Sequence, residues 1–267
     1  MFVKLFSGST IAALCASLAM PVLAQDNEAT DWQLSRMPRQ KTTMAVAKFD
    51  NGLTLVSRCV DYAFDVLIFG LPENPERDRL LEVGVGENAR MRRVAWTAGA
   101  DKTSAFSRFP MTLAHDLMRG GTIRIRNPGQ NGGPSTLYVM ETEPSISAIA
   151  ETLTACRKPL VDPRPKWETD ETLADLPFDM EWADTPMPDP RAFNEIGNFH
   201  STDVNISCLT AEGGRLTDCR IESAHPYNAS INRVLLQGAR RGRLRHKTGE
   251  PIAAGREVSY RMPISVN

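Results

Sequence analysis

Histidine and cysteine are the residue types in this sequence best suited to chemistry, and both are scarce. The 267-residue chain has four histidines and five cysteines. The segment NFHSTD (198–203) places His200 close to a serine and to Asp203, but catalytic triads assemble in space from distant segments. The sequence also contains no G-x-S-x-G nucleophile elbow, no Walker A motif and no dinucleotide-binding fingerprint. We therefore expect no catalytic activity and no cofactor.

The other histidines have structural interpretations. His115 lies in an amphipathic segment, where a packed or surface histidine is the ordinary case, and His225 precedes Pro226 at a turn. The alternative is a secreted hydrolase with an unrecognised site in the N-terminal part of the chain. That alternative requires His115 to lie beside a serine, a cysteine or an acidic cleft.

Residues 1–24 have the pattern of a cleaved secretory signal peptide. A single charge, Lys4, precedes an apolar run, and Val22 and Ala24 occupy positions −3 and −1 of the expected cleavage site. The style of the signal is bacterial, so the expected location is the periplasm. If the signal is retained, the same run anchors the chain in a membrane.

Cleavage leaves four cysteines, and an even number in an exported chain predicts disulfides. They are Cys59, Cys156, Cys208 and Cys219. Three pairings are possible, and no C-x-x-C or Cys/His spacing favours a metal. Joining Cys59 to Cys156 would tie together the ends of the N-terminal region. Cys208 and Cys219 fall opposite each other if Gly213 and Gly214 form a hairpin turn, although that register sets their Cα atoms far apart unless a one-residue bulge intervenes.

Proline and charge divide the chain into two domains. Residues 161–196 are predicted to form an acidic, Pro-rich linker, since eight acidic residues and no Lys or Arg occur over 168–189. A basic run follows in the C-terminal domain, with Arg240, Arg241, Arg243 and Arg245. It has three interpretations: a solvated helix C-terminus, a site for an acidic partner or anionic lipid, or a patch onto which the linker folds back. The third predicts that salt loosens the two-domain arrangement. Export argues against nucleic acid as a partner.

Residues 40–160 are predicted to form a β-sandwich-like domain with two helices. Short β-rich runs alternate with Gly, Pro and Asp clusters, and Asn51-Gly52 is a strong hairpin signal. One helix is expected from Pro110 to the glycines at 120–121, and another carries Ile149 and Leu153 on one side. The fold class is therefore α+β.

Residues 197–267 are predicted to form a small antiparallel sheet with one helix on one face. The order is strand, strand, helix, strand, with Asn228 as the expected helix N-cap. In the last strand Val258, Tyr260 and Met262 alternate with polar residues and should face the core.

Two family resemblances accompany these patterns. The segment VNISCLTAEGGRLTDCRIESAHPYNASINRVLLQGARRGRLRHKTGEPIAAGREVSYRMPI resembles the C-terminal domain of TonB-type energy transducers in the order of its strands, glycine turn, SAHP segment and helix. It departs from that family at 243–245, where an aromatic and a proline are usual. The segments SRCVDYAFDVLIFGLP, TSAFSRFP, LMRGGTIRI and ISAIAETLTAC, with Trp96, more faintly resemble the secreted sandwich domains of invasion-associated and type VI secretion accessory proteins.

The TonB resemblance implies a mode of binding. In that family the edge of the last strand pairs with an extended peptide from an outer-membrane receptor. Carried over, it implies that Val258, Tyr260, Met262 and their neighbours form the binding edge, which Pro263 shortens. The sequence thus predicts a non-enzymatic periplasmic binding or adaptor protein that contacts an envelope or outer-membrane protein. A membrane-anchored TonB-type transducer is the alternative if the signal is retained.

Overall fold

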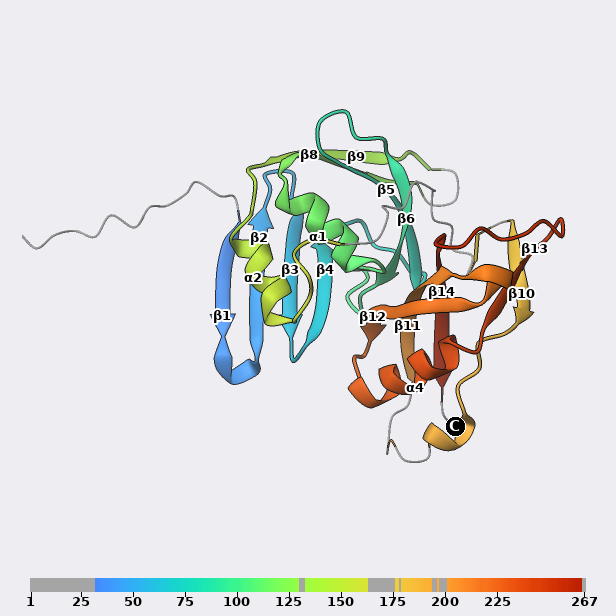
Figure 1. The fold of residues 1–267 in the computed structure, drawn as a ribbon. Helices are drawn as coiled ribbons and strands as arrows, with labels where there is room; N and C mark the ends of the chain where they lie inside the picture. The colour runs from blue at the N-terminus through green and yellow to red at the C-terminus, as the bar shows by residue number, and fades with distance from the viewer. Residues whose placement is uncertain are drawn as a thin grey trace, which may run out of the picture.

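The computed structural model describes residues 32–129, 133–162, 176–177, 179–193, 196 and 201–265. The predicted signal peptide and His200 lie outside these ranges. The described chain is mostly β, with one large and two small antiparallel sheets (Figure 1). No helix in these ranges is long and apolar enough to cross a membrane.

The N-terminal domain is built on one antiparallel sheet of nine strands, in the order β1-β2-β3-β4-β7-β6-β5-β8-β9. The strands are β1 (Gln33–Met37), β2 (Thr42–Lys48), β3 (Thr54–Val60), β4 (Ala63–Phe69), β5 (Asp78–Val85), β6 (Arg92–Ala98), β7 (Ala105–Ser107), β8 (Gly121–Asn127) and β9 (Thr136–Thr142). A short 3-10 turn, η1 (Pro38–Gln40), joins β1 to β2. The strand-forming segments that the sequence indicated are therefore confirmed.

The sandwich-like arrangement predicted for these strands is not what the structure has. The three-residue strand β7 pairs with β4 on one side and with β6 on the other, and so joins all nine strands into one sheet. The domain also begins earlier than residue 40, because β1 pairs with β2 as part of the same sheet. The segment of β1 is polar and lacks the alternating pattern that marks a strand in the sequence. At the β2–β3 hairpin Gly52 has a positive φ and Asn51 does not, so the Asn51-Gly52 turn is not the two-residue type that the dipeptide favours.

Two helices pack on this sheet, as predicted. Helix α1 (Pro110–Met118) packs against β4, and α2 (Ala148–Ala155) packs against β2 and β3. Pro110 opens α1 at a position where its missing N–H costs nothing. The Cys59–Cys156 disulfide joins β3 to the end of α2, with a Cα–Cα distance of 5.5 Å.

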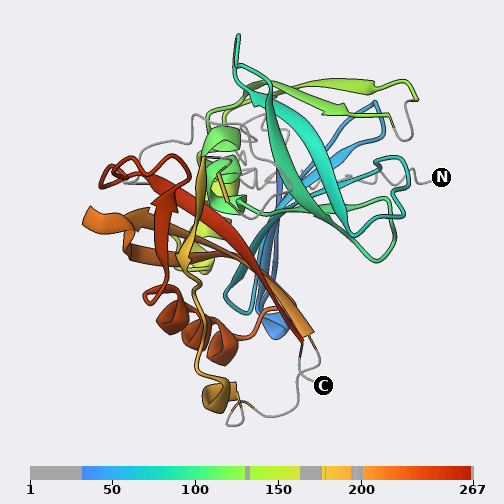
Figure 2. The same ribbon diagram turned by 90° about the vertical axis from the view of Figure 1, so that its right-hand side faces the viewer.

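The C-terminal domain is a three-stranded antiparallel sheet, in the order β12-β11-β14, with a helix on one face (Figure 2). Its elements are β11 (Ser201–Thr210), β12 (Leu216–His225), α4 (Ala229–Ala239) and β14 (Glu257–Ser265). Asn228 caps α4 as expected, because its side-chain oxygen accepts from the N–H groups of Ser230 and Ile231. Val204, Ile206 and Leu235 belong to a buried apolar cluster between this sheet and α4.

The hairpin between β11 and β12 contains the predicted disulfide and the predicted bulge. The turn is a three-residue 3-10 segment, η3 (Glu212–Gly214), so Thr210 lies opposite Leu216. The pairing then shifts by one residue between Ser207 and Leu209, which brings Cys208 and Cys219 to a Cα–Cα distance of 4.0 Å. The longer turn and the bulge compensate for each other.

Part of the predicted linker is a strand. Residues Met180–Asp184 form β10, which pairs antiparallel with β13 (Arg243–His246), and a helical turn, α3 (Pro190–Phe193), follows. The ring of Trp182 on β10 meets that of Tyr260 edge-on, with centroids 5.1 Å apart. In its described part the acidic segment therefore folds back onto the basic run, the third of the interpretations considered for these arginines.

Candidate functional site

Strand β14 lies at an edge of the C-terminal sheet. Within the described residues it pairs only with β11, in a continuous register from Ser201↔Ser265 to Leu209↔Glu257. Such an edge presents main-chain donors and acceptors that another strand can use. The geometry of this edge decides which residues are available for that role.

The side chains of Val258, Tyr260 and Met262 are core residues. All three are buried and pack in the same apolar cluster as Ile206. Burial also raises the pKa of the Tyr260 hydroxyl. Their predicted position on the core face is thus confirmed, and their side chains are not available to touch a partner.

The alternating direction of main-chain groups identifies the residues that face outward. The N–H of Thr210 donates to the carbonyl of Arg256 over 2.9 Å, so Arg256 directs its main chain toward β11. Since hydrogen-bonded and non-hydrogen-bonded pairs alternate along an antiparallel ladder, Val258, Tyr260 and Met262 also bond inward. It follows that Ser259 and Arg261 direct their N–H and C=O groups away from β11.

Pro263 gives an independent check on this assignment. It lies opposite Asp203 in the register, and it follows Ser259 and Arg261 at alternate positions along the strand, so its main chain points the same way. A proline cannot donate to a ladder, so it is tolerated where the missing N–H points away from the neighbouring strand. Pro263 could therefore have identified the outward residues from the sequence alone.

The start of β14 is fixed to the segment before β10. Arg256 donates two hydrogen bonds to the carboxylate of Asp179, at 2.8 and 3.1 Å. Hydrogen bonding to Arg256 holds the pKa of Asp179 below its ordinary value. This contact positions the first residues of the edge.

The four arginines predicted as a binding patch have different environments. Arg245 pairs with Glu181 across the β10–β13 ladder at 2.7 Å, and Arg243 donates to the carbonyl of Gly213 over 2.7 Å. Arg240 and Arg241 are exposed at the end of α4 and make no ion pair with the described residues. Only these two retain the character of a solvated cationic helix end.

Two residues from the histidine-bearing segments, His115 and Asp203, make structural contacts. The Nε2 atom of His115 lies 2.9 Å from the carbonyl oxygen of Pro159, and its Nδ1 atom is buried without a hydrogen-bond partner among the described residues. The carboxylate of Asp203, from the NFHSTD segment, binds Arg261 and Arg77. Neither residue forms part of a nucleophile–base pair in the described chain, which is the arrangement that the hydrolase alternative requires.

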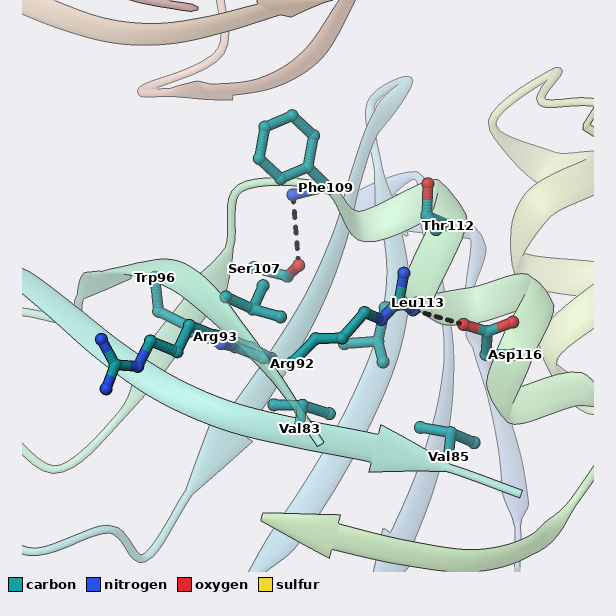
Figure 3. A pocket seen from close by; sticks show the side chains of 11 residues that line it. Val83, Val85, Arg92, Arg93, Trp96, Ser107, Phe109, Thr112, Leu113 and Asp116 are labelled. Carbon is teal, nitrogen blue, oxygen red and sulfur yellow. Dashed lines mark hydrogen bonds and ion pairs between the residues drawn. The ribbon is translucent and has the colours of Figure 1, made fainter. Parts of the chain in front are cut away.

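A hollow opens between α1 and the inner face of β5 and β6 (Figure 3). Its lining is mainly apolar, including Val83, Val94 and Leu113, and Arg92 reaches across toward Asp116 at 3.7 Å. The volume is about 50 Å³, well below the ~150 Å³ of a cavity that binds benzene. It is therefore smaller than a cavity that encloses a single aromatic ring.

Comparison of this chain with protein-family models, with curated proteins and with solved structures gives no match.

Proposed function

We propose that this chain is a non-enzymatic binding or adaptor protein of the bacterial periplasm, which takes up an extended segment of an envelope or outer-membrane protein on strand β14. The observation that carries this proposal is the position of β14 at the edge of the sheet, with the main chain of Ser259 and Arg261 directed outward. The resemblance to TonB-type C-terminal domains supports the same mode of binding.

Location outside the cytoplasm is supported by the cysteines. Both disulfides, Cys59–Cys156 and Cys208–Cys219, persist in oxidising compartments and are rare in the cytosol. The signal-like residues 1–24 agree with this. Fractionation of the native protein distinguishes a released periplasmic form from an anchored transducer, because only the released form lacks these residues.

The chemistry of strand addition limits the partner to a short stretch. Main-chain hydrogen bonds supply affinity without regard to sequence, and the side chains that alternate along the added strand supply selectivity. Pro263 offers no outward N–H, so the ladder must end there. An added strand therefore pairs with Ser259 and Arg261 and with only a few residues on the side of the strand away from Pro263.

A matched pair of substitutions at Ser259 tests the proposal. Ser259→Pro removes the outward N–H but no bond to β11, whereas Ser259→Ala retains the N–H. Partners are captured by crosslinking in intact cells and quantified. We expect Ser259→Pro to reduce the captured partner about tenfold, the effect of losing a hydrogen bond at a packed edge, and Ser259→Ala to leave capture unchanged.

Two results contradict the proposal. Capture at the wild-type level by both the Pro and the Ala variant would show that the edge is not used. Loss of capture in both would assign binding to the serine side chain. A melting temperature within a few degrees of the wild type confirms that either variant is folded.

A further inference from the structure

Along its central strand β11, the second face of the C-terminal sheet is polar but is buried as completely as the first. Along β11, Asp203, Asn205 and Ser207 point away from α4, yet Asp203 is only 1 % exposed and Ser207 is 0 % exposed. This face is covered by the N-terminal domain, since β12 contacts both α1 and β4. Figures 1 and 2 show the two domains side by side. The side of the domain interface that β11 provides is therefore polar.

One group of ions crosses this interface at β14. Arg261 binds the carboxylate of Asp203 within its own sheet and donates to Asp78 of the N-terminal domain over 2.7 Å. Asp78 also accepts from Arg108 at 2.6 Å, and Asp203 lies 3.2 Å from Arg77. Hydrogen bonding to Asp203 raises the pKa of Arg261. Three arginines and two aspartates thus alternate across the boundary between the domains.

A second group lies at the other side of the sheet. Arg220 on β12 donates two hydrogen bonds to Asp162, at 2.9 and 3.0 Å, and a further one to the buried Glu222. Burial acts to lower the pKa of Arg220, but the carboxylates of Asp162 and Glu222 outweigh it and raise the pKa. Asp162 is the second residue of the predicted linker and lies six residues beyond Cys156, whose disulfide fixes the end of the N-terminal domain.

The apolar cores do not cross the interface. One cluster of buried apolar residues belongs to the nine-stranded sheet with α1 and α2, and a separate cluster belongs to the C-terminal sheet with α4 and β10. Polar interfaces between domains permit relative motion, because water can replace the lost partners when the surfaces separate. Salt weakens ion pairs that water can reach and weakens buried pairs much less. The side chains of Arg261 and Asp78 are 14 % and 25 % exposed, and those of Arg220 and Asp162 are 21 % and 18 % exposed, so water reaches both pairs.

We propose that the ion pairs of Asp78, Asp162 and their arginines form a salt-sensitive latch between the two domains. At low ionic strength the latch is closed and the polar face of the C-terminal sheet is covered. At high ionic strength the domains separate as rigid bodies, and each keeps its own core.

The latch also reaches the binding edge. Arg261 directs its main chain outward from β14 and places its side chain in the latch. Closing the latch fixes this residue in its extended conformation and so prepares the edge for an added strand. Only this last consequence depends on the proposed function. By thermodynamic reciprocity, a strand bound at β14 then favours the closed latch by the same factor.

Solution scattering of the full chain tests the latch without any partner. Profiles are recorded between 50 and 500 mM NaCl for the wild type and for Asp78→Asn, which removes the N-terminal partner of Arg261. Asp61→Asn is the matched control, because it breaks an exposed ion pair with Lys41 inside the N-terminal domain. We expect the radius of gyration to increase with salt. Asp78→Asn should raise the ratio of open to closed molecules about fivefold at a given salt concentration, with Asp61→Asn like the wild type.

Asp162→Asn provides a second test at the other group of ions, with the same expected direction. A radius of gyration that stays constant with salt in the wild type and in both interface variants overturns the latch, as does equal behaviour of Asp78→Asn and Asp61→Asn. Expansion accompanied by loss of the far-UV circular dichroism signal indicates unfolding and also overturns it. The Ser259 capture experiment is separate, so failure of the latch and failure of strand addition are distinguishable.

Discussion

Along β11, the two faces of the C-terminal sheet are equally buried but differ in what buries them. Val204, Ile206 and Cys208 lie on the apolar face and form a core that α4 completes. Asp203 and Ser207 lie on the opposite face, against the other domain. Exposing an apolar face to water costs the free energy that the hydrophobic effect supplies on burial. Polar groups that become exposed instead form hydrogen bonds with water. The buried fraction alone therefore does not distinguish a permanent core from a separable interface. The apolar or polar character of the buried groups makes that distinction.

Neighbouring residues of β11 allow the sharpest test of this difference. Ile206→Ala removes a fully buried side chain from the apolar face and should cost about 4 kcal/mol of unfolding free energy. Asn205→Ala removes a 2.8 Å hydrogen bond to Ser223 on the polar face and should cost about 1 kcal/mol. Hydrogen exchange measured on α4 and β11 peptides reports both values locally. Similar costs for the two variants would contradict the distinction between the faces.

The disulfide on the apolar side should have the next largest effect. Cys208 and Cys219 are separated by 11 residues, and a loop of about that length is worth about 3 kcal/mol in the chain-entropy model. Replacing both cysteines by alanine should destabilise the C-terminal domain by up to that amount without opening the latch. Denaturant unfolding followed by exchange in β12, together with scattering at low salt, measures both outcomes. An expanded low-salt profile would mean that the hairpin also supports the interface.

The apolar face was predictable from the sequence and the polar face was not. Capping residues and alternation located α4, β14 and the cysteine pair, because these signals are local. The same alternation set Val258, Tyr260 and Met262 against polar residues, and nothing in a single strand reveals that another domain will cover the polar face. The contacts of Arg261 with Asp78 and of Arg220 with Asp162 join residues that are distant in the chain.

The other differences have the same origin. The acidic composition around β10 is typical of a tether, and its pairing with β13 depends on a partner about 60 residues away. The single nine-stranded sheet depends on the three-residue β7, which is too short for its pairing on both sides to be read from the sequence. At the candidate edge, the predicted strand was placed correctly. The outward residues required the register, although Pro263 already contained the necessary information.

A change of pH should affect the polar face more than the apolar one. The ring of His225 packs at a tilt of 57° against that of Phe106 of the N-terminal domain, with centroids 4.7 Å apart, and its Nε2 atom lies 3.7 Å from Asp65. Burial lowers the pKa of His225; Arg58 acts in the same direction, and Asp65 and Asp203 oppose it. A lowered pKa means that the folded protein favours the neutral ring.

Stability from this histidine is therefore fully present above the ordinary pKa of about 6.5 and is lost as pH falls through the lowered value. Thermal unfolding and scattering from pH 8 to pH 4.5 should show the domains separating more readily in acid. His225→Gln should flatten this dependence while acidic carboxylates still titrate at lower pH. A steeper acid response in that variant would reverse the assigned sign.

The smallest effect is expected at the exposed contact between the folded-back segment and β13. Arg245 and Glu181 are both solvent-accessible, so Arg245→Gln should cost about 0.5 kcal/mol or less. The Arg245→Gln variant separates two sources of salt dependence, because both the β10–β13 contact and the latch consist of opposite charges. β10 packs against the core of the C-terminal domain, and its partner β13 belongs to that same domain. Loosening this contact therefore leaves the domain boundary unchanged, and the scattering profile of Arg245→Gln should follow the wild type at every salt concentration. A shift as large as that of Asp78→Asn would instead mean that the folded-back acidic segment, rather than the polar face of the sheet, holds the two domains together.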